Sequence, residues 1–131
     1  MVAAYDVGKA INPLLAEGQI QGGTMMGLGA AIMENLHPYH PSLDWQPQTI
    51  GDYVIPTAVD LPHMETEILE CPSTEGPYGA KGIGEMTANT PGPAIVNAIH
   101  NAVGVWINAL PVTPEKVLRA LDEKALGEKA H

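Results

Sequence analysis

The sequence has 131 residues, of which 45% are hydrophobic, and a formal net charge of −9 at pH 7. This is typical of a globular domain with a hydrophobic core, and six basic residues against fifteen acids exclude a nucleic-acid interface and disfavour an anionic membrane surface. The single cysteine, Cys71, excludes an internal disulfide or an iron–sulfur cluster held by this chain alone. With no secretory signal and no long apolar run, we expect a cytoplasmic protein.

The first third of the chain predicts a short strand followed by a long helix. The strand is expected at Val2–Tyr5, an apolar stretch. Asn12 is a favourable N-cap and Pro13 suits the first helical position. The helix is expected to run from Pro13 to about Asn35, with apolar positions at Leu14, Leu15, Ile20, Met26, Leu28, Ile32 and Met33.

This helix carries an unusual number of glycines, namely Gly18, Gly22, Gly23, Gly27 and Gly29. Each glycine costs about 1 kcal/mol relative to alanine, so side chains at these positions must obstruct something. Gly22 and Gly23 follow Gln19 by three and four residues and clear the surface beside it. The alternative is close packing of the helix against a sheet, and both can hold on different faces.

The middle of the chain predicts an irregular connection and two short strands. Residues 37–52 are polar and proline-rich, and His37 and His40 lack the further ligands that a zinc site needs. A short edge strand is expected at Tyr53–Ala58, limited by a proline. Met64–Leu69 alternates in polarity and predicts a half-buried strand.

A glycine-rich run follows, with four glycines in residues 76–85 and one carboxylate, Glu85, at its end. Glycines permit positive φ angles and a close approach of the backbone to a ligand. Such a loop suits a general base beside a bulky cofactor, whereas the alternative is a solvated glutamate at a turn. Lys81 either compensates phosphates of a cofactor or is solvated.

The last third predicts two more helices. The first has an apolar face at Ala94, Ile95, Ala98, Ile99, Ala102, Val103 and Trp106. The second begins with Thr113 as N-cap and Pro114 at the first position, with Val117, Leu118 and Leu121 turned inward, and residues 122–131 are expected to be a frayed tail. We therefore predict an α+β fold, in which two long helices and a C-terminal helix pack on a small sheet.

Several blocks of the sequence resemble the molybdenum hydroxylases, the family of xanthine dehydrogenase and aldehyde oxidoreductase. The matching blocks, in order, are Asn12-Pro13, Gly18-Gln19-Ile20-Gln21-Gly22, Gly27-Leu28-Gly29, Tyr53-x-x-Pro56 and Gly82-Ile83-Gly84-Glu85. The resemblance implies that Glu85 is the catalytic base and that Gln19 hydrogen-bonds the pterin cofactor. It also implies that Gly82, Ile83 and Gly84 supply backbone contacts and a wall of the substrate pocket.

The resemblance further implies that residues 1–131 are the C-terminal part of a molybdopterin-binding domain in a larger, or split, catalytic subunit. The complete enzyme would oxidise an N-heterocycle or an aldehyde with water as oxygen source, and would pass electrons to iron–sulfur and FAD partners. The cytosine-dinucleotide form of molybdopterin is usual in bacterial members, but the sequence does not select it. The isolated chain is expected to hold no cofactor, to be inactive and to form a homo-oligomer. The alternatives are a non-catalytic assembly module supporting a sister subunit and a truncated gene product without function.

Overall fold

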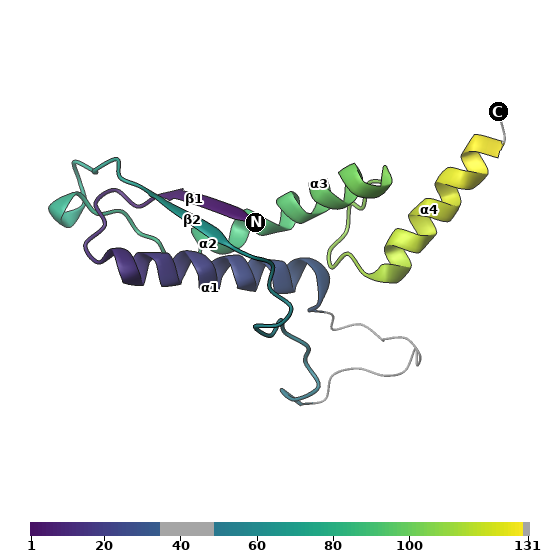
Figure 1. The fold of residues 1–131 in the computed structure, drawn as a ribbon, viewed down its shortest axis with the longest axis horizontal. Coiled ribbons are helices and arrows are strands. Elements are labelled where there is room, and N and C mark those ends of the chain that lie inside the picture. The colour runs from purple at the N-terminus through teal and green to yellow at the C-terminus, as the bar shows by residue number, and fades with distance from the viewer. Residues whose placement is uncertain (35–48, 130–131) are drawn as a thin grey trace. The chain divides into compact units, whose positions relative to one another are not determined.

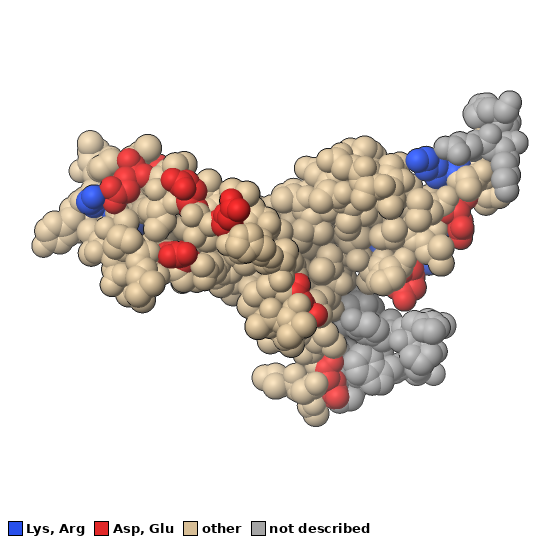
Figure 2. Space-filling model, viewed as in Figure 1, with Lys and Arg blue, Asp and Glu red and all other residues tan. Residues whose placement is uncertain are grey.

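The computed structural model describes residues 1–34 and 49–129. The chain divides into two compact units, one made of Met1–Gly27 and Thr57–Pro91 and the other of Leu28–Pro56 and Gly92–His131. None of the described helices is long and apolar enough to cross a membrane. On the face drawn in Figure 2, acidic side chains outnumber basic ones.

The first unit contains a parallel pair of strands, β1 (Val2–Asp6) and β2 (Glu65–Leu69), and most of helix α1 (Pro13–Ile32). Val2 lies opposite Glu65 and the register continues to the last residues of both strands. Parallel neighbours need a long crossover connection, and α1 forms part of it. The strands lie along α1 (Figure 1), where the Thr66 hydroxyl donates to the Glu17 carboxylate at 3.2 Å.

The start of α1 follows the expected capping pattern. The side-chain oxygen of Asn12 accepts a hydrogen bond from the Leu15 amide at 3.1 Å. The Asn12 carbonyl accepts one from the Ala16 amide at 3.0 Å, which begins the helical ladder. The helix ends at Ile32, a turn earlier than the expected Asn35.

Only part of the expected apolar stripe of α1 is buried. Ile20 and Leu28 lie in the interior, whereas Leu14, Leu15 and Met26 are 76%, 69% and 59% exposed. Figure 1 shows only short elements beside this helix in the first unit. Two short strands cannot cover a 20-residue helix, so part of its apolar surface faces outward.

The glycine-rich run contains a 3-10 turn, η1 (Pro77–Gly79), and leads into a short helix, α2 (Met86–Asn89). Among its glycines only Gly79 has a positive φ, at +82°, and the adjacent Tyr78 has a φ of +55°. The remaining glycines in the run are therefore needed, if at all, for space and not for backbone conformation.

The second unit is built on helices α3 (Pro91–Val103) and α4 (Pro114–Lys129). Its core consists of Val105, Ile107 and Val112. The side chains that pack around this core are Ile32, Val96, Ile99, Val103, Val117, Ala120 and Leu121. The amide of Val112 donates to the Ala31 carbonyl at 2.6 Å, which ties the core segment to the end of α1.

The predicted inner face of α3 was partly wrong. Ile99 and Val103 pack inward with Val96, but the alanines at positions 94, 98 and 102 are exposed and Trp106 is 58% exposed. The helix is rotated toward its larger aliphatic side chains, which bury more apolar area than alanine does.

Helix α4 begins as expected and ends later. The Thr113 hydroxyl accepts a hydrogen bond from the Lys116 amide at 3.4 Å. Leu118 is 60% exposed, contrary to the prediction, and residues 122–129 continue the helix instead of forming a frayed tail. This stretch is rich in Ala, Leu, Glu and Lys, which all favour helix.

The strand expected at Tyr53–Ala58 is absent. Tyr53 instead donates its hydroxyl to the Glu34 carboxylate, and this raises the pKa of the Tyr53 phenol. The described part of the chain thus has an α+β fold with a two-stranded sheet, which confirms the predicted class.

Candidate functional site

The structure brings together two of the predicted site residues, Gln19 and Gly84, which lie 65 positions apart in the sequence. The Gln19 side chain is exposed on α1, and its Nε2 donates to the Gly84 carbonyl at 2.9 Å. Glu85 follows Gly84 directly, at the N-cap position of α2. Its side chain is exposed and does not cap that helix. The uncharged Gln19 amide therefore lies beside the backbone that leads directly into Glu85, on the surface of the first unit.

A close contact between α1 and α2 fixes this arrangement. The Thr87 side chain is fully buried, and its Oγ1 lies 3.4 Å from the Gln19 carbonyl and 3.5 Å from the Gly84 carbonyl. A Cβ at Gly23 would stand 1.8 Å from Thr87 Oγ1. A Cβ at Gly27 would stand 2.5 Å from the Ala88 carbonyl oxygen. These glycines allow the backbone of α2 to lie directly on α1.

The opposite situation holds at four other glycines. A Cβ at Gly18, Gly22, Gly82 or Gly84 would meet nothing within 4 Å. Two of these positions flank Gln19 on α1 and two immediately precede Glu85. The expectation that Gly22 and Gly23 both clear the surface beside Gln19 holds for Gly22 only, because Gly23 is packed against Thr87, as Gly27 is against Ala88. The packing partner is α2 and not the sheet.

The unobstructed surface fits a flat, polar cofactor. Its backbone is accessible, it has no side chains at the four glycines, and it offers the neutral amide of Gln19. An amide both donates and accepts hydrogen bonds. Because Nε2 of Gln19 is directed to Gly84, Oε1 remains as an acceptor.

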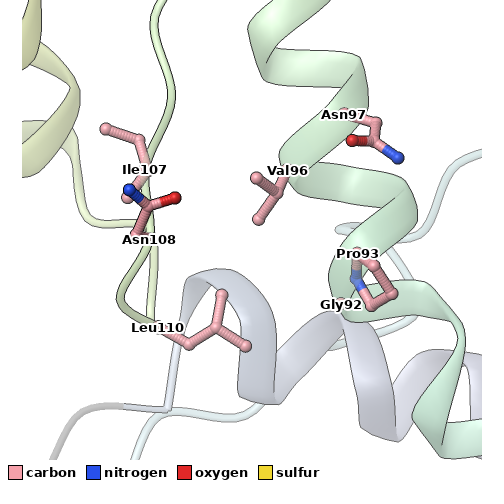
Figure 3. A pocket seen from close by; sticks show the side chains of 7 residues that line it. All are labelled: Gly92, Pro93, Val96, Asn97, Ile107, Asn108 and Leu110. Carbon is pink, nitrogen blue, oxygen red and sulfur yellow. The ribbon is translucent and has the colours of Figure 1, made fainter.

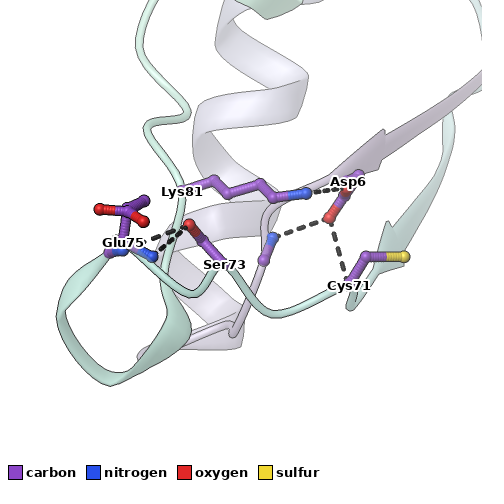
Figure 4. A network of polar contacts seen from close by, with 7 residues as sticks. Asp6, Cys71, Ser73, Glu75 and Lys81 are labelled. Carbon is purple, nitrogen blue, oxygen red and sulfur yellow. Dashed lines mark hydrogen bonds and ion pairs between the residues drawn. The ribbon is translucent and has the colours of Figure 1, made fainter.

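A polar network at the end of β1 holds the start of the loop that carries Glu85 (Figure 4). The Asp6 carboxylate accepts hydrogen bonds from the Gly8 amide at 2.8 Å, the Cys71 amide at 3.2 Å and the Lys81 ammonium. The Lys81 hydrogen bond, followed by that of Gly8, lowers the pKa of Asp6. Lys81 is therefore paired within the chain and does not stand free for phosphates of a cofactor.

Sequence reasoning singled out neither Asp6 nor Thr87. Asp6 had a recognisable signal, because an Asp two residues before a Gly is typical of a turn closed by the carboxylate. Thr87 had none, since its burial depends on Gly23, which is 64 positions away in the chain.

The other side chains that could bind a metal or take part in chemistry give weaker support for a functional site. Among the described residues, no three His, Cys, Asp or Glu side chains could hold a metal ion together. His37 and His40 lie outside the described residues. Cys71 is exposed as a free thiol. The His100 ring stacks on Trp106, with ring centroids 3.9 Å apart.

The second unit has a cavity of about 310 Å³ (Figure 3). Val96 points into it from α3 and Asn97 points away. Its lining is Gly92, Pro93, Val96, Asn97, Ile107, Asn108 and Leu110. None of these side chains titrates, so the cavity offers shape and packing but no acid or base.

The chain matches known molybdenum proteins. The model of the molybdopterin cofactor-binding domain family matches residues 1–62. The xanthine dehydrogenase molybdenum-binding subunit of Escherichia coli O157:H7 is 40% identical over 113 residues, which are 86% of this chain and 15% of that protein. The chain spans about a sixth of the length of the curated relatives that it matches.

Solved structures agree with this match. Quinoline 2-oxidoreductase from Pseudomonas putida 86 aligns with a TM-score of 0.80 and 35% identity, covering 93% of this chain and 16% of that one. The aldehyde oxidoreductase from Desulfovibrio desulfuricans ATCC 27774 aligns with a TM-score of 0.78 and 39% identity, covering 92% and 13%. Sequence blocks, fold and cofactor-binding family thus agree, and the chain belongs to the xanthine dehydrogenase and aldehyde oxidoreductase family, in which it matches a segment of the molybdenum-binding subunit.

Proposed function

We propose that this chain contributes the general base and part of the cofactor surface to a molybdopterin-dependent hydroxylase. The observation that carries the proposal is the hydrogen bond between Gln19 and Gly84, which sets the amide beside Glu85. The relatives' names include a quinoline oxidoreductase, a nicotine hydroxylase and aldehyde oxidoreductases. These names support an aromatic N-heterocycle or an aldehyde as substrate, and water as the oxygen source is part of the proposal.

Gln19 would hold the molybdopterin through its free Oε1, with Gly18 and Gly22 leaving room beside it. Gly82 and Gly84 would bring their backbone close to the cofactor, and Ile83 would form a wall of the substrate pocket. When bound, the molybdenum cofactor supplies the two-electron oxidation and the oxygen transfer.

Glu85 would act as the general base. A base must stand within hydrogen-bond reach of the proton that it removes and must be held on a fixed backbone. Glu85 meets the second requirement, because Gly84 is bonded to Gln19 and Thr87 is buried against Gly23. Its side chain is exposed, and the two glycines before it, Gly82 and Gly84, have open space around them.

The electrons would leave through iron–sulfur and FAD groups on partner chains or domains. A relative from Paenarthrobacter nicotinovorans is named as subunit gamma of a dehydrogenase complex, which is in keeping with such partners. Either molybdopterin itself or its cytosine dinucleotide would fit the proposal.

Replacing Glu85 by Gln in the complete enzyme tests this function. The amide keeps the shape of the side chain but cannot take the proton. We expect a molybdenum content near that of the wild type and a kcat lower by about 10²–10⁴-fold. Glu75, an exposed glutamate in the same loop region, provides the control Glu75→Gln, which should stay near wild type. Retention of more than about a tenth of kcat by Glu85→Gln would exclude a general base.

An assembly module remains the second candidate, because α1 exposes large apolar side chains such as Leu14 and Leu15. That function predicts that Glu85→Gln and Gln19→Ala change neither molybdenum content nor turnover of the purified complex.

A further inference from the structure

We propose that the ion pair between Asp6 and Lys81, here called the clamp, positions the loop that carries Glu85. This inference rests on the proposed role of Glu85 as general base. Asp6 and Lys81 are then positioning residues, because they act on the reaction only through the backbone that leads to Glu85.

The backbone of residues 79–81 is attached by hydrogen bonds to the residues that follow β1. The Lys9 amide donates to the Gly79 carbonyl at 2.8 Å, and the Lys81 amide donates to the Val7 carbonyl at 3.0 Å. Gly8 has a φ of +69°, and a Cβ there would stand 2.4 Å from the Gly79 oxygen. The loop therefore lies against bare backbone as far as Lys81.

Beyond Lys81 the support changes. Gly82 has open space around it, and the next attachment is the hydrogen bond from Gln19 to the Gly84 carbonyl. Residues 82 and 83 thus span two fixed points, and Glu85 follows the second. Because this span is only two residues long, the position of Lys81 limits where the Gly84 carbonyl can lie, and with it the start of α2 at Glu85. A misplacement of about 1 Å at a reacting group can cost about 10²-fold in rate.

The clamp joins three segments through one carboxylate (Figure 4). Asp6 Oδ1 accepts from the amides of Gly8 and Cys71, and Oδ2 accepts from Lys81. The end of β1, the chain after β2 and the loop are therefore held at a common point. A change at Lys81 removes the side-chain attachment of the loop without removing the two backbone hydrogen bonds that Asp6 accepts.

A second ion pair nearby supplies a matched control. Lys9 Nζ lies 2.8 Å from Glu70 Oε2, and these side chains are 52% and 37% exposed. The Lys81 and Asp6 side chains are comparably accessible, at 39% and 35%. Lys9 follows β1 and Glu70 follows β2, so this ion pair also links the ends of the two strands. The hydrogen bonds of the Glu70 carboxylate go to Lys9 and Ala10, and not to residues 80–85.

The experiment compares Lys81→Met, Lys81→Arg, Asp6→Asn and Lys9→Met in the complete holoenzyme. Measured quantities are kcat, KM, molybdenum content and hydrogen exchange of peptides covering residues 80–88. Lys81→Met should lower kcat about tenfold or more with little change in KM or molybdenum, and should speed exchange in residues 82–86. Lys81→Arg should keep kcat and the hydrogen-exchange rate of residues 82–86 close to wild type, and Lys9→Met should change neither quantity.

Asp6→Asn should lower kcat and speed hydrogen exchange as Lys81→Met does. The double variant should lower kcat no further than either single variant, because each substitution removes the same ion pair. Wild-type exchange in Lys81→Met would overturn the clamp, and so would faster exchange with an unchanged kcat. Loss of molybdenum in Lys81→Met, without faster exchange, would show instead that Lys81 serves the cofactor directly. A wrong role for Glu85 is detected separately, by turnover in Glu85→Gln.

Discussion

Gln19 and Gln21 stand two residues apart on α1 and have different surroundings. Gln19 reaches the Gly84 carbonyl, whereas Gln21 donates to the Glu17 carboxylate on its own helix at 3.2 Å. Side chains two positions apart point about 200° away from each other around a helix. Only Gln19 lies beside the loop with Glu85, which is why the pair offers a matched comparison.

We expect Gln19→Ala in the complete enzyme to reduce molybdenum occupancy or to cause a modest loss of rate. A hydrogen bond of this kind contributes on the order of 1 kcal/mol, so the loss should be smaller than for Glu85→Gln. Metal analysis and steady-state kinetics measure both quantities, with Gln21→Ala as control. If the Gln19→Ala enzyme has the molybdenum occupancy and the rate of the wild type, Gln19 does not contact the cofactor.

At the scale of elements, α1 has glycines of two kinds. Gly23 and Gly27 lie against α2, whereas Gly18 and Gly22 border open space. The distinction concerns neighbouring positions on one helix, so a single methyl group should have opposite effects at Gly22 and Gly23.

Gly23→Ala should destabilise the subunit, because the new Cβ would stand 1.8 Å from the buried Thr87 hydroxyl oxygen. Overpacking costs about 1–3 kcal/mol and outweighs the gain in helix propensity of about 1 kcal/mol. Gly22→Ala should keep or raise the thermal stability of the metal-free protein and should lower its molybdenum occupancy. Thermal unfolding with metal analysis checks both, and normal occupancy in Gly22→Ala would mean that nothing binds over this surface.

Rules that depend on neighbouring residues in the sequence predicted the helices and strands better than they predicted which face of each helix is packed. The Asn12 and Thr113 caps and the half-buried strand β2 depend on neighbouring residues, and the sequence suffices for them. The inner face of α3 depends on which segment packs against it, namely Val105–Val112, and helical spacing alone fits its alanines equally well. The contact of Gln19 with Gly84 spans 65 positions, so only the family resemblance placed the two blocks in one site.

At the scale of the whole molecule, both units leave large apolar side chains uncovered. Ile11, Leu14 and Leu15 are 64%, 76% and 69% exposed around the start of α1. In the second unit, Trp106 and Leu118 are 58% and 60% exposed. Adjoining apolar surface of this kind usually contacts a partner, and the relatives contain about six times as much chain as is present here.

We therefore expect the isolated 131-residue chain to self-associate and to have neither hydroxylase activity nor bound molybdenum. Gel filtration with light scattering, together with metal analysis, measures the association and the metal content, and an assay with N-heterocycles and aldehydes measures the activity. Replacing both Leu14 and Leu15 by Gln should reduce the association if copies meet at the start of α1, because the substitution removes apolar surface that association would take out of water. Glu17→Gln on the same helix is a suitable control, since Glu17 is already half-buried against Thr66. A monomer at high concentration would show that these apolar side chains do not need a partner, and bound molybdenum would show that this chain alone carries enough of the cofactor site.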